Sequence, residues 1–114
     1  MSVLLTNPQA LNLWLNAATA RVRSEAPNLT ERQMALLLTV YLTPAPHTVR
    51  GLAARLVVTK PVITRALDTL GQAGLLKRTR DQLDRRNVLV ERTTKGSAFL
   101  AELSNTIVDA GRGA

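Results

Sequence analysis

Residues 48–70 read TVRGLAARLVVTKPVITRALDTL, and this stretch decides the fold. Thr48 is a favourable N-cap for a short helix. The apolar side of that helix is Leu52, Ala53 and Leu56. After a short turn, Thr59 is a favourable N-cap for a second helix. Its apolar positions recur at helical spacing, at Ile63, Ala66, Leu67 and Leu70. This arrangement predicts a helix-turn-helix over about residues 48–73.

The outward face of the second helix is small, polar and basic. With the apolar stripe buried, helical geometry directs these side chains away from the core: Lys60, Pro61, Thr64, Arg65 and Asp68. All but Asp68 lie in the N-terminal turns, which can enter a major groove about 12 Å wide, where Arg or Lys reaches guanine O6 and N7. The helix start at Thr59 and Lys60 also suits a phosphate. The alternative is that Thr59 serves only as the N-cap of the helix and that the basic side chains contact only water.

A β-hairpin is predicted directly after this helix. Gly74 ends the helix as a left-handed C-cap. Residues 75–80 and 87–93 are short segments rich in β-branched or alternating residues, which is typical of paired strands. Together they predict a wing over about residues 75–93.

The tip of this hairpin is cationic, with Arg85 and Arg86 beside Asp84. A cationic tip on a thin ribbon suits a minor groove, whose narrow stretches attract arginine. We interpret Asp84, with Asp81 as a second candidate, as a strut that orients Arg85 or Arg86. The flanking strands add further basic residues, namely Lys77, Arg78, Arg80 and Arg92. Of these, we expect Arg78 and Arg80 to contact DNA together with Asp84, Arg85 and Arg86 at the tip.

Helices are predicted at three further places. They cover about residues 8–26, with Asn7 as N-cap; residues 31–43, introduced by a capping box of Thr30 and Gln33; and about residues 94–110, capped by Thr93 or Thr94. We expect the tail from Gly111 onward to fray. The chain is therefore predicted to be a single winged helix-turn-helix domain over residues 1–114. It is mainly α with a small hairpin, and the flanking helices serve the core and dimerisation.

Composition narrows the function classes. Apolar residues make up 46% of the chain but aromatic residues only 3%, so the core must be aliphatic. The absence of cysteine excludes disulfides, thiolate zinc sites, iron-sulfur clusters and a cysteine redox switch. The net charge of +7 arises between Arg50 and Lys95, with neutral flanks. A basic excess confined to one segment favours a surface that binds a polyanion, against the alternative of a basic surface kept for solubility.

Catalytic chemistry is not indicated. The only histidine, His47, lies between prolines and a helix cap, without a sequence-adjacent nucleophile or carboxylate. Neither a glycine-rich phosphate loop nor metal-ligand spacing occurs. We therefore expect a protein that is not an enzyme and has no cofactor or metal. Because neither a signal peptide nor a membrane span is visible, we expect a cytoplasmic protein that is not associated with a membrane.

Four motifs follow one another in a specific order: TVRGLAARL (48–56), TKPVITRALDTL (59–70) with GLL (74–76), DQLDRR (81–86) and TTKG (93–96). In this order they resemble the MarR family of bacterial winged-helix transcription regulators, over roughly residues 30–100. The resemblance implies a homodimer that binds a pseudo-palindromic operator in double-stranded DNA. It places recognition helices in the major groove and wings in the flanking minor groove.

The resemblance also implies roles for particular residues. The recognition positions are Thr59, Lys60, Pro61, Thr64 and Arg65. The wing arginine is Arg86, with Arg85 beside it and Asp84 as buttress. Such proteins usually repress transcription. Many release DNA when a small-molecule effector, often aromatic, binds between the dimerisation and DNA-binding regions.

The chain departs from the family pattern in three ways. Arg92 stands where an apolar residue normally precedes the last helix, so the packing of the wing is expected to differ. Gly71 interrupts the recognition helix, at a cost of roughly 1 kcal/mol relative to Ala. The chain also ends near the fifth helix, whereas typical members continue through a further dimerisation helix. The expected dimer surface is Leu11, Trp14, Leu15 and Ala18 with Phe99, Leu103, Ile107 and Ala110. Alternatively, these stripes only cover the core of one copy.

A second class of function remains open. A winged helix can dock on another protein, or bind DNA architecturally without reading bases. The surface of the recognition helix discriminates between these classes, because interaction modules expose apolar or acidic residues there. This helix exposes Lys60, Thr64 and Arg65, which favours DNA. A replication initiator or an antitoxin of the same fold also remains compatible with the sequence.

Overall fold

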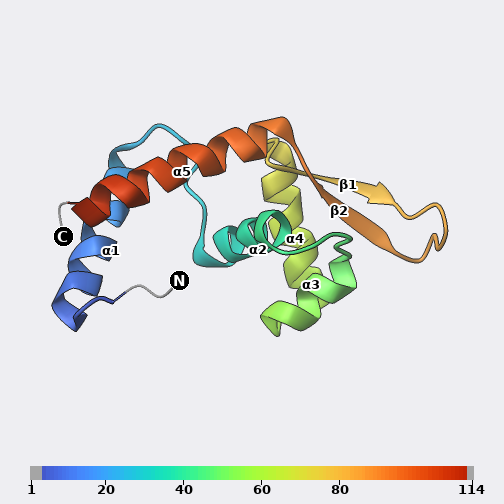
Figure 1. Ribbon diagram of the computed structural model, residues 1–114. Coiled ribbons are helices and arrows are strands. Elements are labelled where there is room, and N and C mark those ends of the chain that lie inside the picture. The colour runs from blue at the N-terminus through green and yellow to red at the C-terminus, as the bar shows by residue number, and fades with distance from the viewer. Residues whose placement is uncertain (1–3, 113–114) are drawn as a thin grey trace. The chain divides into compact units, whose positions relative to one another are not determined.

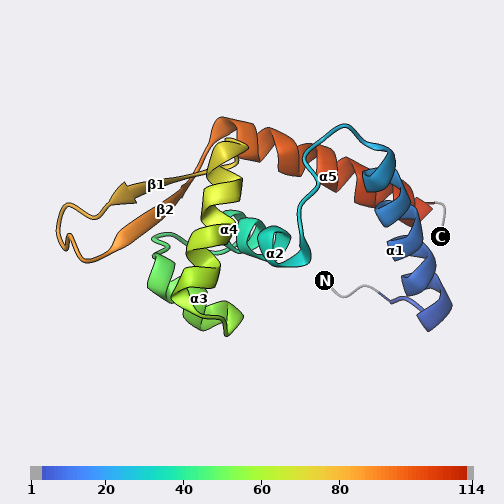
Figure 2. The same cartoon turned by 180° about the vertical axis from the view of Figure 1, so that it is seen from behind.

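The computed structural model describes residues 4–112, which form helices and one β-hairpin (Figures 1 and 2). In chain order the elements are α1 (Asn7–Arg23), α2 (Glu31–Leu42), α3 (Val49–Leu56), α4 (Lys60–Gln72), β1 (Leu76–Arg80), β2 (Val88–Arg92) and α5 (Thr94–Arg112). The predicted winged helix-turn-helix, mainly α with a small hairpin, is confirmed. The chain folds as two compact units: residues 29–98, and the described parts of segments 1–28 and 99–114.

Local capping explains where α2 and α3 begin. The Thr30 hydroxyl accepts the amide of Gln33, whose side chain in turn accepts the Thr30 amide, which completes the predicted capping box. The Thr48 hydroxyl accepts the Gly51 amide at 2.9 Å and starts α3 as predicted. Helix α3 ends at Leu56, and its C-cap residue Val57 has a φ of 55°, in the left-handed region. This residue forms the turn that leads into α4.

The end of α4 directs the chain into the wing. Gly74 has a φ of 77°, and its amide donates to the Gly71 carbonyl at 3.0 Å. The Leu75 amide donates to the Leu70 carbonyl at 2.9 Å. This pair of bonds around a left-handed glycine is a Schellman motif. The predicted C-cap is therefore confirmed, and β1 begins two residues later.

The wing is a two-stranded antiparallel hairpin in which Leu76 pairs with Arg92 and Arg80 with Val88. Figures 1 and 2 show it projecting from helices α2 to α4 as an arm. Its base is attached to the segment before α3, because the Val90 amide donates to the His47 carbonyl at 2.8 Å. The arm is thus anchored at one end and exposed at the other.

The core of residues 29–98 is aliphatic, as the composition predicts. The buried side of α4 is the predicted stripe of Ile63, Ala66, Leu67 and Leu70. It meets the buried residues of α2 and α3, namely Leu36, Leu37, Val40, Val49, Leu52 and Ala53. Leu75, Leu76 and Val90 add the base of the wing. Within residues 4–112, no polar or charged residue is buried.

Tyr41 joins α2 to the start of α5. Its hydroxyl donates to the Leu75 carbonyl at 2.8 Å and accepts the Thr93 amide at 2.9 Å. The Thr93 hydroxyl accepts the Gly96 amide and donates to the Gly74 carbonyl, so Thr93 is the residue that caps α5. A β-carbon at Gly96 would collide with the Tyr41 hydroxyl and the Leu75 carbonyl. This close approach requires glycine.

Arg92 has a structural role at the C-terminus of α2. Its guanidinium donates to the carbonyls of Val40 at 3.0 Å and Thr43 at 3.4 Å, and lies 5.8 Å from the centroid of the Tyr41 ring. A cation at the C-terminal end of a helix is favoured by the helix dipole. The wing is therefore attached here by the charged side chain of Arg92. The family that the sequence resembles normally has an apolar residue at this position.

The terminal helices correct three predicted boundaries. The N-cap of α1 is Thr6 and not Asn7, because Thr6 forms a capping box with Gln9. Helix α1 ends at Arg23, three residues before the predicted end. Helix α5 continues to Arg112, past the point where fraying was expected. Among the described residues, no helix has the length and apolar character needed to cross a membrane.

Candidate nucleic-acid interface

The outward face of α4 carries the predicted recognition residues. Lys60, Pro61 and Arg65 are exposed and Thr64 is half-buried. Together with Asp68 these side chains line one shallow hollow of about 440 Å³. They are held in this direction because the opposite side of α4 is packed into the core. The hollow therefore brings together two cations, Lys60 and Arg65, and one carboxylate, Asp68.

Thr59 behaves differently from the other threonines that precede helices. Its backbone has N-cap geometry, but its side chain makes no capping hydrogen bond. Thr6, Thr30 and Thr48 all use their hydroxyls to cap. Thr59 and Lys60 are both exposed at the start of α4. The prediction that Thr59 is the N-cap of this helix is confirmed, but its hydroxyl makes no capping hydrogen bond.

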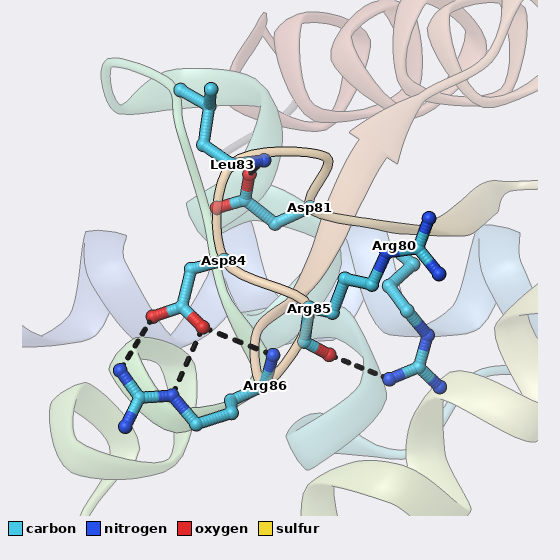
Figure 3. A network of polar contacts seen from close by, with 6 residues as sticks. All are labelled: Arg80, Asp81, Leu83, Asp84, Arg85 and Arg86. Atoms are coloured by element: carbon cyan, nitrogen blue, oxygen red, sulfur yellow. Dashed lines mark hydrogen bonds and ion pairs between the residues drawn. The ribbon is translucent and has the colours of Figure 1, made fainter.

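At the wing tip, the Asp84 carboxylate forms an ion pair with the Arg86 guanidinium (Figure 3). Asp84 Oδ1 accepts Arg86 Nε at 3.0 Å and the Arg86 amide at 3.1 Å, and Oδ2 accepts Nη2 at 3.0 Å. These side-chain and backbone hydrogen bonds from Arg86 lower the pKa of the Asp84 carboxyl, and the same carboxylate raises the pKa of the Arg86 guanidinium. The expected strut is thus present, and its partner is Arg86.

The other tip residues have different partners. Asp81 is not an arginine strut, because its Oδ1 accepts the amide of Leu83 at 2.9 Å. The Arg85 carbonyl accepts Arg80 Nη1 at 2.6 Å, a hydrogen bond that joins the end of β1 to the tip loop (Figure 3). The Arg85 side chain is exposed. Arg80 therefore stabilises the tip, and Arg85 is directed by no ion pair among the described residues.

Arg78, expected among the wing residues that face DNA, is tied to α4. Its Nη2 lies 2.6 Å from Asp68 Oδ1, and the two side chains are 35% and 55% exposed. This ion pair joins the recognition helix to β1. Sequence reasoning named both residues but not their pairing. Ten positions separate them, and only the Schellman turn at Gly74 brings them together.

Sequence reasoning also missed Arg50. This exposed arginine of α3 is close enough to the wing tip for its charge to lower the pKa of Asp84, although less than the hydrogen bonds from Arg86 do. In the sequence, the only sign that Arg50 belongs to this basic surface was its position in the basic segment between Arg50 and Lys95. The basic surface of residues 29–98 therefore includes α3 as well as α4 and the wing.

The candidate dimer residues of α1 are exposed in the single chain. Leu11, Trp14 and Leu15 are 72%, 65% and 60% exposed. The buried residue of this helix is Ala17, and Asn16 Nδ2 donates to the Ala110 carbonyl of α5 at 3.5 Å. On α5, Phe99 and Leu103 are half-buried, Ile107 is exposed, and Ala110 is buried. The large apolar side chains of α1 are therefore exposed in the single chain, and the role of both stripes in a dimer stays a prediction.

Comparison with known proteins gives one family. The model of the MarR family matches residues 29–88. The HTH-type transcriptional regulator MgrA of Staphylococcus aureus is 32% identical over 78 residues, which are 68% of this chain and 52% of MgrA. The chain thus spans about half the length of the curated relatives it matches.

Solved structures share the same fold. The transcriptional regulator BldR from Sulfolobus solfataricus is 28% identical, with a TM-score of 0.63, over 92% of this chain and 81% of BldR. A mutant MarR from E. coli, complexed with operator DNA, is 24% identical with a TM-score of 0.69, over 92% of this chain and 69% of that MarR. These similarities extend over most of the described chain.

Proposed function

This chain belongs to the MarR family, and from that premise we propose that it is a transcriptional regulator that binds double-stranded DNA sequence-specifically. We further propose that it represses transcription as a homodimer on a pseudo-palindromic operator. The observation that carries the proposal is the pairing, within residues 29–98, of a basic outward face on α4 with an arginine-bearing wing tip. Its relative MgrA is named as an HTH-type transcriptional regulator, and the related E. coli MarR is seen with operator DNA.

Helix α4 is the proposed reader of the major groove. Lys60 and Arg65 are exposed next to Thr64, so cationic donors and a hydroxyl stand on one helix face. Arg and Lys pair with guanine edges, whereas a hydroxyl contacts either kind of edge. Pro61 adds a rigid apolar surface for a thymine methyl or a sugar. The Thr59 hydroxyl, which makes no capping hydrogen bond, and the positive end of the α4 dipole suit a phosphate, which would set the register of the helix on the duplex.

The wing tip is the proposed minor-groove element. Both carboxylate oxygens of Asp84 accept hydrogen bonds from the Arg86 guanidinium, which favours one orientation of that exposed side chain before DNA binds. A side chain already held in one orientation loses less freedom on binding. Arg85 adds a second positive charge at the tip, while Arg78 and Arg80 hold the wing in shape rather than contact bases.

Dimerisation is proposed through α1 and α5. Three large apolar side chains of α1 (Leu11, Trp14 and Leu15) are exposed at positions i, i+3 and i+4, which is one helix face. Ile107 of α5 is also exposed. A contiguous apolar face of this kind is typical of a subunit interface. As in many members of the family, we propose that a small-molecule effector modulates DNA binding.

The deciding experiment is selection from a random double-stranded DNA pool at roughly 0.15 M salt, with the mass of the protein in solution measured in parallel. We expect an inverted repeat with half-sites about one helical turn apart, and the mass of a dimer. The matched control is the double variant Lys60→Ala, Arg65→Ala, which leaves the core intact and should recover no motif. If the wild-type chain also recovers no motif, the winged helix acts instead as an interaction or architectural module.

A further inference from the structure

Leu83, at the tip of the wing, is the most exposed large apolar residue of residues 4–112, at 99%. Single exposed apolar side chains are common, so exposure alone carries little information. The place of Leu83 is what distinguishes it. It stands at the outer end of the hairpin arm, between Asp81 and Asp84, and three positions from the clamped Arg86.

The backbone that carries Leu83 is held on both sides. Asp81 Oδ1 accepts the Leu83 amide at 2.9 Å, and the Asp81 amide donates to the Asn87 carbonyl at 3.1 Å. The Asn87 amide in turn donates to the Asp84 carbonyl at 3.0 Å. Figure 3 shows the Leu83 side chain directed away from this network, on the other side of the loop from Arg86. Backbone hydrogen bonds therefore hold the loop that carries Leu83, and its apolar side chain projects into solvent.

A hairpin tip in a minor groove faces two walls about 6 Å apart. Each wall consists of phosphates, which attract cations, and deoxyribose rings, whose C–H surfaces are apolar. The wing tip carries a group suited to each of these surfaces: the Arg86 cation lies on one side of the loop and the apolar Leu83 side chain on the other. Proteins that enter the minor groove commonly use apolar side chains there.

We propose that Leu83 packs against the deoxyribose wall of the minor groove when Arg86 enters it. This inference rests on the proposed function, because it assigns a second residue of the same wing tip to DNA. A leucine contact releases no counterion, so its contribution to affinity does not change with salt. An arginine contact does change with salt, and this difference makes the two contributions separable.

The test compares Leu83→Asn with Leu83→Met on the selected operator, between about 0.05 and 0.2 M salt. We expect Leu83→Asn to bind roughly tenfold more weakly at every salt concentration with an unchanged salt slope, because about half of the leucine is buried on DNA. Leu83→Met keeps an apolar side chain and should stay within about twofold of wild type. Thermal unfolding should be the same for all three proteins, since the side chain is exposed.

Each other outcome has a definite meaning. Equal DNA affinity of Leu83→Asn and wild type overturns the inference alone, and a protein partner then becomes the occupant to seek. A loss accompanied by a smaller salt slope also overturns it, because the effect would then act through Arg86. A wild-type chain that binds no DNA overturns the proposed function together with this inference.

Discussion

Arg65 and Arg86 are both exposed arginines, but the protein holds them differently. The Arg65 guanidinium makes no ion pair within residues 4–112, whereas Arg86 is clamped by both oxygens of Asp84. An arginine without a protein partner can turn its planar edge toward a base and pair with it. A clamped arginine suits a site whose position is set by the shape and potential of the groove.

Alanine substitutions should separate these two roles. We expect Arg65→Ala to cost about 1–3 kcal/mol on the operator and to relax the preference at one base position. Arg86→Ala should weaken binding to all sequences alike and lower the salt slope by about one. Titrations against operator and scrambled duplexes at several salt concentrations measure both effects. If Arg65→Ala leaves affinity for every sequence unchanged, α4 does not read the major groove.

The Asp84–Arg86 ion pair clamps the guanidinium at the wing tip, and the titration of Asp84 should report this clamp directly. Its pKa is lowered by the side-chain and backbone hydrogen bonds of Arg86, and burial opposes this shift. A carboxyl whose folded-state pKa is depressed contributes stability above its unfolded pKa of about 3.9, and loses it as pH falls through the folded pKa. The clamp is thus intact at neutral pH and opens only in acid.

NMR titration of the Asp84 carboxyl carbon checks this. Its midpoint should lie below that of an ordinary aspartate, and Arg86→Ala should move it back toward the ordinary value. Arg85→Ala is the control and should leave the midpoint in place, since Arg85 makes no contact with the carboxylate. An unmoved midpoint in Arg86→Ala would mean that the ion pair does not form in solution.

Val57 is strained. A β-branched residue at a φ of 55° is a steric outlier, costing about 1–2 kcal/mol. Glycine removes this cost but adds about 0.5–1 kcal/mol of chain entropy, so Val57→Gly should stabilise the protein by roughly 0.5–1 kcal/mol. Little burial is lost, because Val57 is 88% exposed. Denaturant unfolding measures the change, with the half-buried Val58→Gly as a control that should destabilise.

At the scale of elements, charged side chains attach the wing. The ion pair of Asp68 with Arg78 links α4 to β1, and Arg92 links β2 to the end of α2. The proposed major-groove and minor-groove elements are therefore held on the same frame as the buried stripe of α4. An apolar residue at position 92 would lose the two carbonyl contacts of Arg92 and the dipole interaction.

Two glycines in helices should respond in opposite ways to alanine. Gly96 lies against the Tyr41 hydroxyl and the Leu75 carbonyl, so Gly96→Ala must displace backbone and should cost about 2–4 kcal/mol. At Gly71 the nearest atom to an added β-carbon is 4.0 Å away, so Gly71→Ala should gain about 0.5–1 kcal/mol of helix propensity. Chemical denaturation of both variants tests this, and a neutral Gly96→Ala would disprove the close packing at the start of α5.

At the scale of the whole molecule, the central question is association through α1. Trp14 is the only tryptophan, and it is 65% exposed in the single chain. If the proposed dimer forms on this face, the emission of Trp14 should shift to shorter wavelengths as the protein concentration rises. Leu11→Glu should abolish both the shift and the dimer mass, because it places a charge in the apolar contact.

The matched control is Leu42→Glu, which puts the same charge at an exposed leucine of α2. It should leave the shift and the mass unchanged. A dimer that forms without any change in Trp14 emission would place the interface on another surface.

The elements and their order were predictable from the sequence because their signals are local. The Thr30–Gln33 box, the Thr48 cap, the α4 stripe and the Gly74 turn each lie within a few residues. The start of α1 was missed because two caps compete there. Asn7 before proline fits one pattern, but the side chain of Gln9 lies in register with Thr6 and not with Asn7.

By itself, the sequence determined which segments are helices, which side of α4 is buried, and that basic side chains gather between Arg50 and Lys95. Only the tertiary structure decided which of those cations form ion pairs or hydrogen bonds with other residues of the protein. Arg78 pairs with a residue ten positions away and Arg92 with one 52 positions away, whereas Arg65 has no ion pair in the described chain. The physical reason is distance along the chain: capping and periodicity act over one or two helical turns, but a charge meets its partner only after the core has packed.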